Sequence, residues 1–114
     1  MYIPPVVIRK IQRNIDLVEL MQNCGVIIKL PTGSRVLALC PFHDDSRASL
    51  SINRKKGLYY CFACGASGNA FSYISWKHNS RYFPDVVRIA AEIAGIDLDR
   101  ELYRKEVVKK ASHK

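Results

Sequence analysis

The chain has 114 residues, of which 48% are hydrophobic and 25% are charged, and this composition allows one domain with a small core. Its 18 Lys and Arg residues outnumber 10 Asp and Glu residues, and the net charge of +8 favours a polyanionic partner such as nucleic acid. Apolar runs fall short of the roughly 20 residues that span a bilayer, and charge interrupts the N-terminal apolar stretch too early for a signal peptide. We therefore expect a cytoplasmic protein without a membrane partner, whose reduced cysteines are available for a metal or for catalysis.

The N-terminal third of the sequence predicts two helices. Pro4 and Pro5 open a helical pattern of apolar residues. Asn14 is expected to cap a second short helix over residues 15–22, and Gly25 ends this helical region.

Two hairpins are predicted in the middle of the chain. The apolar stretches 26–30 and 35–39 flank the turn sequence Pro-Thr-Gly-Ser, which is typical of two strands and a turn. Residues 49–53 and 57–61 form a second pair of strands around the basic run Arg54-Lys55-Lys56. Gly65 and Gly68 then indicate a loop.

Helices return after this loop. Asn69 is expected to cap a helix that runs to residue 78, and Pro84 suits the first turn of a last helix that Gly95 stops. The apolar pattern fades beyond residue 98, so we expect a domain over residues 1–98 and a charged linker or frayed helix over 99–114. The fold class is α+β, with helices at both ends of a small antiparallel sheet.

Four soft ligands stand in two tight pairs. Cys40 and His43 are separated by two residues, and so are Cys61 and Cys64. Seventeen residues lie between the pairs, enough for a strand, a turn and a returning strand that bring the pairs together, as in a zinc ribbon. A site with four protein ligands has no open position. We therefore expect one structural Zn²⁺ and no catalytic residue.

Other interpretations of these residues are weaker. A redox dithiol at Cys61 and Cys64 leaves the first pair unexplained, and the chain lacks the βαβ pattern in which such motifs occur. Cys24 follows an apolar helix and is interpreted as a buried thiol. His78 and His113 lie outside any ligand spacing and are expected to be exposed.

The run from Cys40 to Ile74, with its Cys-Pro-Phe-His and Cys-Phe-Ala-Cys-Gly motifs, resembles the N-terminal zinc-binding domain of bacterial replicative primases. The likeness extends to the opening and closing helices and covers nearly the whole chain. It implies a zinc ribbon on a five-stranded antiparallel sheet, and it matches the two ligand pairs to the family's zinc ligands one for one. It also implies a domain that engages single-stranded template and helps to choose where priming starts. A separate polymerase domain joins the nucleotides in that family, and a helicase-binding domain follows it.

The chain departs from the family pattern on the surface rather than in the framework. After the histidine the family usually has an acidic residue, a lysine and Thr-Pro-Ser-Phe. The lysine and proline positions are here Ser46 and Ala48, and Arg47 is a substitute for the lost charge. Arg35 stands one place away from a basic position on the strand before Cys40. This divergence indicates a branch from a phage or mobile element with its own start-site preference.

Basic and aromatic residues lie together in the sheet region, as a single-strand-binding platform requires, because cations contact phosphates while aromatic faces stack on bases. The residues expected to contact DNA are Arg35, Arg47, Arg54, Lys55, Lys56, Tyr59 and Tyr60. The alternative is that Tyr60 packs in the core and that the lysines form a solvated hairpin tip.

The sequence suggests three alternative functions. The first is a template-engaging zinc module that is non-catalytic by itself and works with a primase polymerase domain, in the same chain or a separate one, and with the replicative helicase. The second is a stand-alone zinc-ribbon regulator that binds DNA or a replication protein and has no role in priming. The third is a small metalloenzyme, which the four-ligand site and the lack of a poised base disfavour.

Overall fold

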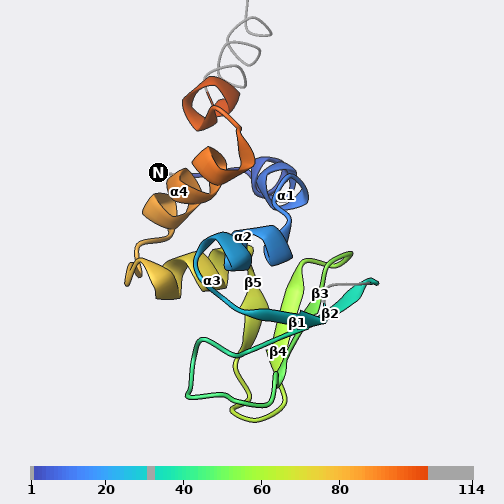
Figure 1. Cartoon of the computed structure of the whole chain (residues 1–114). Coiled ribbons are helices and arrows are strands. Elements are labelled where there is room, and N and C mark those ends of the chain that lie inside the picture. The colour runs from blue at the N-terminus through green and yellow to red at the C-terminus, as the bar shows by residue number, and fades with distance from the viewer. Residues whose placement is uncertain (1, 31–32, 103–114) are drawn as a thin grey trace, which may run out of the picture.

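The computed structural model describes residues 2–30 and 33–102 (Figure 1). Two helices precede the sheet, and two helices and a helical segment that begins at residue 98 follow it. In chain order the elements are α1 (Pro5–Arg13), α2 (Leu17–Asn23), β1 (Ile28–Leu30), β2 (Arg35–Ala38), β3 (Leu50–Asn53), β4 (Leu58–Cys61), β5 (Ser67–Asn69), α3 (Ala70–Lys77) and α4 (Phe83–Ala94). No helix among these residues is long and apolar enough to cross a membrane.

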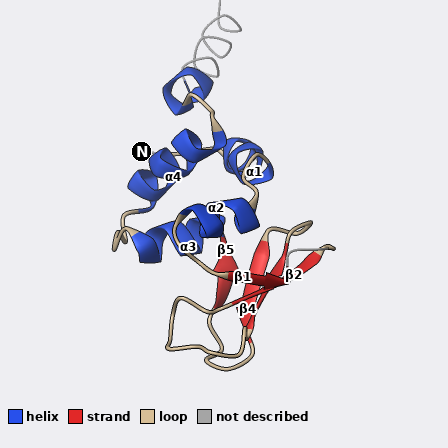
Figure 2. Cartoon of the chain, in the orientation of Figure 1, coloured by secondary structure: helices blue, strands red, loops and turns tan. Residues whose placement is uncertain are grey.

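The five strands form one antiparallel sheet in the order β1-β2-β3-β4-β5 (Figure 2). The expected α+β class and the five-stranded sheet implied by the family resemblance are therefore confirmed. The residue pattern alone missed β5 and indicated a loop. Ser67–Asn69 is a three-residue edge strand with a central glycine, so its own strand propensity is low. It is a strand because it pairs with β4.

The start of α2 differs from the prediction. The capping residue is Asp16, whose Oδ1 accepts the N–H groups of Val18 and Glu19 at 3.0 and 3.3 Å. Asn14 instead ends α1, and its side-chain amide donates to the carbonyl of Lys10 at 2.8 Å. The backbone decides between the two, because an N-cap needs extended angles: ψ is 111° at Asp16 and 8° at Asn14.

The later helix boundaries agree with the prediction. Asn69 accepts the N–H of Ser72 at 3.1 Å, and the Ser72 hydroxyl accepts the N–H of Asn69 at 3.3 Å, which completes a capping box. Pro84 lies in the first turn of α4, and Gly95 ends this helix with a left-handed φ of 74°.

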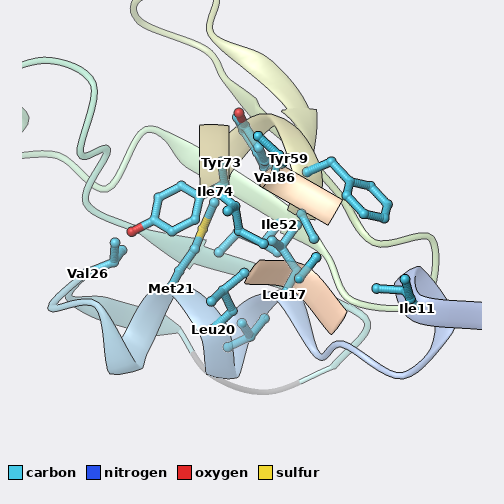
Figure 3. Close-up of a cluster of buried hydrophobic side chains, with 14 of the residues drawn as sticks. Ile11, Leu17, Leu20, Met21, Val26, Ile52, Tyr59, Tyr73, Ile74 and Val86 are labelled. Carbon is cyan, nitrogen blue, oxygen red and sulfur yellow. The ribbon is translucent and has the colours of Figure 1, made fainter. Parts of the chain in front are cut away.

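One face of the sheet is covered and the other is open. The covered face packs against α2 and α3, and Figure 3 shows Met21 and Tyr73 from these helices meeting Ile52 from the sheet. Strand side chains alternate between faces, so the next residues along each strand point away from the core. We call these two surfaces the inner face and the outer face. The buried inner-face residues are Val36, Ala38, Leu50, Ile52, Tyr59 and Cys61.

The C-terminal segment predicted as a linker is described only in part. Residues 98–102 are helical, Leu98 is buried, and Glu101 forms an ion pair with Lys10 of α1 at 3.0 Å. The remainder of the segment, together with His113, lies outside the described residues. The boundary at residue 98 stays a prediction.

Gly68 is expected to be essential to the join between β5 and α3. A Cβ atom at this position would lie 2.6 Å from Cβ of Ser72, which the first turn of α3 fixes in place, and 2.9 Å from the Tyr59 hydroxyl. Gly68→Ala should therefore lower the free energy of unfolding by about 1–3 kcal/mol, measured by chemical denaturation of the zinc-loaded domain. Ser67→Ala, on the exposed neighbouring residue, is the matched control. Equal stability of the two variants would contradict this packing.

Candidate metal centre

The topology of the sheet places both ligand pairs at one end of it. β2 and β4 each run antiparallel to β3, so they point in the same direction and end at the same edge. Cys40 lies two residues beyond β2, and Cys61 is the last residue of β4. The loops that follow these strands lie next to each other at the bottom of the view in Figure 1. A site shared between the loops follows directly from this arrangement.

The four ligand atoms converge on one point. The Sγ atoms of Cys40, Cys61 and Cys64 and a ring nitrogen of His43 all lie within 4.8 Å of one another. Cys40 Sγ and Cys64 Sγ are 3.8 Å apart, and Cys61 Sγ and His43 Nδ1 are 3.9 Å apart. Ligands at about 2.3 Å from a tetrahedral zinc ion lie about 3.8 Å from one another. Three thiolates and one imidazole at this separation fit a single structural zinc.

The competing interpretations do not match this geometry. A redox dithiol at Cys61 and Cys64 would not explain why Cys40 and His43 reach the same point. Cys24 is half-buried and lies outside the cluster, as does His78 on the surface after α3. The sequence predicted a buried thiol at Cys24, whereas the residue is only half-buried because it lies at the C-terminal end of α2.

Backbone conformation and aromatic packing hold the two ligand turns. After the second turn, Gly65 adopts a φ of 78° and donates its N–H to the carbonyl of Cys61 at 2.9 Å. In the first turn, Phe42 stacks on Tyr59 with ring centroids 5.4 Å apart and meets the edge of Trp76 at 4.6 Å. The ligand turns are thereby anchored to the inner face and to α3.

Asp45 organises the loop that carries the first ligand pair. Its side chain is only 4% exposed and accepts the N–H groups of Cys40 at 2.9 Å, Ser49 at 2.8 Å and Arg47 at 3.1 Å. Oδ1 also accepts the Ser49 hydroxyl at 3.2 Å and lies 3.8 Å from His43 Nε2, the ring nitrogen that faces away from the cluster. A carboxylate behind a metal-binding histidine orients the ring. The residue pattern alone does not indicate this role for Asp45.

These hydrogen bonds affect the pKa of the carboxyl group. The N–H groups of Cys40 and Ser49, followed by that of Arg47, hold the pKa of Asp45 well below its usual range. An unfolded chain has an aspartate pKa of about 3.9. The interaction therefore stabilises the fold above about pH 4, and this stability is lost as the pH falls toward the folded-state pKa.

The thiols of the cluster influence one another's protonation. Burial, together with the neighbouring Cys61 and Cys64, raises the pKa of Cys40 to about 12, although the Phe42 N–H opposes this. Burial also raises the pKa of Cys61, but N–H groups of Cys64 and Ala63 outweigh it, and the net pKa is lowered. One thiolate thus makes the next thiolate harder to form. A bound Zn²⁺ would overcome this repulsion, because its positive charge favours the deprotonated form of every cysteine ligand.

The cations expected to contact DNA lie at two ends of the sheet. Arg47 is exposed in the loop of the first ligand pair, at the zinc end, whereas Arg35 is exposed on the outer face of β2 and pairs with Asn53, next to the β3–β4 turn. The run from Arg54 to Lys56 forms the turn between β3 and β4, at the end of the sheet away from the ligand cluster (Figure 1). The structure therefore does not gather them into one patch.

The two tyrosines of β4, both expected to contact DNA, point to opposite faces of the sheet. Tyr59 is 5% exposed and packs in the core, so its ring is not available for stacking on a base in this structure. Tyr60 points to the outer face and is 48% exposed, which also rules out its alternative placement in the core. Its edge contacts Phe62, a 65% exposed residue that sequence analysis did not select, at a centroid distance of 5.3 Å. The sequence does contain a signal for Phe62, because side chains two residues apart in an extended chain share a face and Phe62 follows Tyr60 by two residues.

Asp45→Asn tests the role of the buried carboxylate. The amide nitrogen cannot accept the hydrogen bonds that a carboxylate oxygen accepts, so at least one N–H group of the loop loses its partner. We expect zinc affinity to fall about 10- to 100-fold, measured by competition with a chromogenic chelator. Asp44→Asn removes the same charge from the exposed neighbouring residue and should leave the affinity unchanged. Wild-type affinity in both variants would show that Asp45 does not support the metal.

Known proteins resemble this chain over the same region. The family model of the CHC2 zinc finger matches residues 3–106. The DNA primase of Mycoplasma genitalium is 40% identical over 87 residues, which cover 76% of this chain and 14% of that protein. The DNA primase of Synechocystis sp. is 43% identical over 82 residues (72% and 12%), and that of Pseudomonas putida is 34% identical over 104 residues (91% and 15%). The chain thus spans only 12–15% of the length of these three relatives.

A solved structure agrees with these relatives. The crystal structure of the Aquifex aeolicus primase, which holds zinc-binding and RNA polymerase domains, matches with a TM-score of 0.68 and 27% identity. The match covers 83% of this chain and 23% of that one. The family model covers nearly the whole sequence, and the Cys-His-Cys-Cys cluster has the expected ligands. The chain therefore belongs to the CHC2 zinc-finger family, as a zinc-binding domain of the DNA-primase type.

Proposed function

We propose that this domain engages single-stranded DNA template and helps to select the position at which a primer starts, while a separate polymerase domain joins the nucleotides. Family membership supports this role. The Aquifex aeolicus primase also contains a zinc-binding domain together with an RNA polymerase domain. The observation that carries the proposal is the outer face of the sheet, which exposes aromatic side chains next to basic ones.

The outer face has the chemistry of a single-strand platform. Tyr60 stands opposite Ser51 of β3, and Leu37 of β2 continues the same row. Arg35 lies two residues along β2 from this row. Base stacking on an exposed aromatic ring contributes about 1–3 kcal/mol, and arginine beside it binds phosphate or stacks in turn. Weak, salt-sensitive binding to a single strand follows from such a surface.

The zinc end of the outer face adds a second aromatic residue and a second cation. Phe62 donates its N–H to the carbonyl of Ser49 at 2.9 Å, two residues from the exposed Arg47. Both therefore belong to the loops that the metal holds together. We assign Cys40, His43, Cys61 and Cys64 as the ligands of this zinc, whose role is structural because no coordination position remains open.

The expected partners follow from the same proposal. A primase polymerase domain, in this chain or in another, would supply nucleotide joining, and the replicative helicase would be the further partner of the assembled primase. A stand-alone regulator without a priming role is the alternative. DNA binding alone does not separate these two functions, whereas the choice of primer start sites does.

The first prediction concerns stacking. Tyr60→Ala should weaken binding to single-stranded DNA about 5- to 150-fold, the factor that corresponds to one stacked base, with an unchanged salt dependence because no phosphate contact is lost. Fluorescence anisotropy with a labelled oligothymidylate at several salt concentrations measures both quantities. Tyr82→Ala is the control, because Tyr82 is a similarly exposed tyrosine (59%) at the start of α4. Equal effects of the two changes would remove Tyr60 from the site.

The second prediction concerns priming. We expect a primase polymerase domain fused after this chain to start primers at fewer template positions than the polymerase domain alone. Cys64→Ser in the fusion should restore the scattered pattern, because the loss of a zinc ligand loosens the loops around the outer face. Sequencing of primer 5′ ends gives the distribution. The same distribution with and without the zinc domain would favour the stand-alone regulator.

A further inference from the structure

A groove runs between α1 and the β3–β4 turn, at the end of the sheet away from the zinc. We call it the basic groove. It has a volume of about 330 Å³, within the range of small-ligand sites of about 300–1,000 Å³. Its lining consists of the cations Arg9, Arg13, Arg54, Lys55 and Lys56, together with the uncharged residues Gln12, Ile15 and Gly57.

Local structure explains why the cations face one another. Arg9 and Arg13 are separated by one helical turn and therefore share a face of α1, while Val7 and Ile11 on another face are buried in the core. The turn opposite is held by Asn53, whose Oδ1 accepts the N–H of Lys56 at 3.0 Å.

Gly57 brings this turn close to α1. It takes a φ of +67°, and a Cβ atom there would lie 3.9 Å from Gln12 Nε2. Asp16, the cap of α2, contacts Arg54 with 3.5 Å between Oδ2 and Nε, and so ties the turn to the segment after α1. The groove is therefore built by tertiary contacts.

The charge of the groove is largely uncompensated. Arg54 has its partner in Asp16, but none of the ion pairs among the described residues involves Arg9, Arg13, Lys55 or Lys56. Like charges one helical turn apart, such as Arg9 and Arg13, destabilise a helix. An anion in the groove would offset this repulsion and would receive several charge-assisted hydrogen bonds.

We propose that the basic groove binds phosphates of the single-stranded DNA that crosses the outer face, so that Arg9 and Arg13 of α1 belong to the nucleic-acid interface. This inference rests on the proposed function and extends it to a second contact. The lining has hydrogen-bond donors and positive charge but no aromatic ring, so it suits the backbone of DNA rather than its bases.

A strand of DNA suits the position better than an isolated anion. Lys56 in the β3–β4 turn and Tyr60 on the outer face belong to the same hairpin and are four residues apart, so their Cα atoms lie at most about 14 Å from each other. A polymer of phosphates and bases reaches both, with phosphates held in the groove and a base stacked on Tyr60. A small anion reaches only the groove.

The test compares two double variants of the whole zinc-loaded chain, R9Q/R13Q in the groove and R88Q/R100Q outside it, in the same anisotropy assay with oligothymidylate. All four arginines are exposed, and each double variant removes two charges. Each lost phosphate contact lowers the log–log salt slope by about 0.7, so R9Q/R13Q should lower it by about 1.4. Between 50 and 200 mM salt, wild-type affinity should thus fall about sevenfold more than that of the variant. R88Q/R100Q should keep the wild-type slope.

A second groove variant, K55Q/K56Q, changes the opposite wall of the groove, so that an effect of α1 alone can be recognised. It should lower the salt slope by a comparable amount. A decrease in only one of the two groove variants would overturn the shared groove, and so would an equal decrease in R88Q/R100Q. Unchanged slopes in both groove variants, with weaker binding by Tyr60→Ala, would overturn the groove and leave the outer face standing. Lower slopes without an effect of Tyr60→Ala would support the groove and refute stacking. Failure of the wild-type chain to bind at 50 mM salt would refute both proposals.

Discussion

Three thiols and an imidazole within 4.8 Å of one another form a four-ligand site for one cation, and the order of this end of the sheet depends on that site. Burial and the neighbouring sulfurs raise the pKa of Cys40 to about 12, so the cluster resists the charge that metal binding needs until the metal is present. Structural zinc supplies about 10–16 kcal/mol of apparent binding free energy, as much as the whole stability of a typical domain, about 5–15 kcal/mol. The loops after β2 and β4 are thus organised mainly by the ion.

The metal acts on the rest of the fold through two side chains of one loop. Phe42, between the first two ligands, packs on Tyr59 of the inner face and on Trp76 of α3. Asp45 collects four hydrogen bonds from the loop and stands behind the ring of His43. Movement of the ligands would disturb the core and the loop backbone together. The same coupling holds Arg47 and Phe62 beside the outer face, where the proposed function needs them.

The molecule separates two kinds of surface along the sheet. The exposed rings of Tyr60 and Phe62 lie on the outer face and at the zinc end, whereas a dense group of cations lies at the other end, between α1 and the β3–β4 turn. Aromatic faces contact bases, and cations hold phosphates without regard to sequence. A single strand bound to both would be positioned by its backbone at one end and contacted through its bases along the sheet. Such a division suits a domain that positions template for another domain.

The metal site is the part of this protein that the sequence determined almost alone. Two ligand pairs with short gaps, and a span between them that suits one hairpin, predict the cluster because a tetrahedral ion accepts few spacings. Pro84 and Gly95 predicted the bounds of α4 for an equally local reason, since their backbone angles are restricted or unusually free.

Tertiary structure decided what depends on a partner. Alternation along β4 places Tyr59 and Cys61 on one face and Tyr60 on the other, but only the packing of α2 and α3 determines which face is buried. β5 forms because the edge of β4 needs hydrogen-bond partners. The basic groove brings Arg9 and Arg13 close to a turn some 40 residues later in the chain. No local pattern encodes this proximity, because the free energy that fixes it comes from burial of α1 and from the Asp16–Arg54 contact.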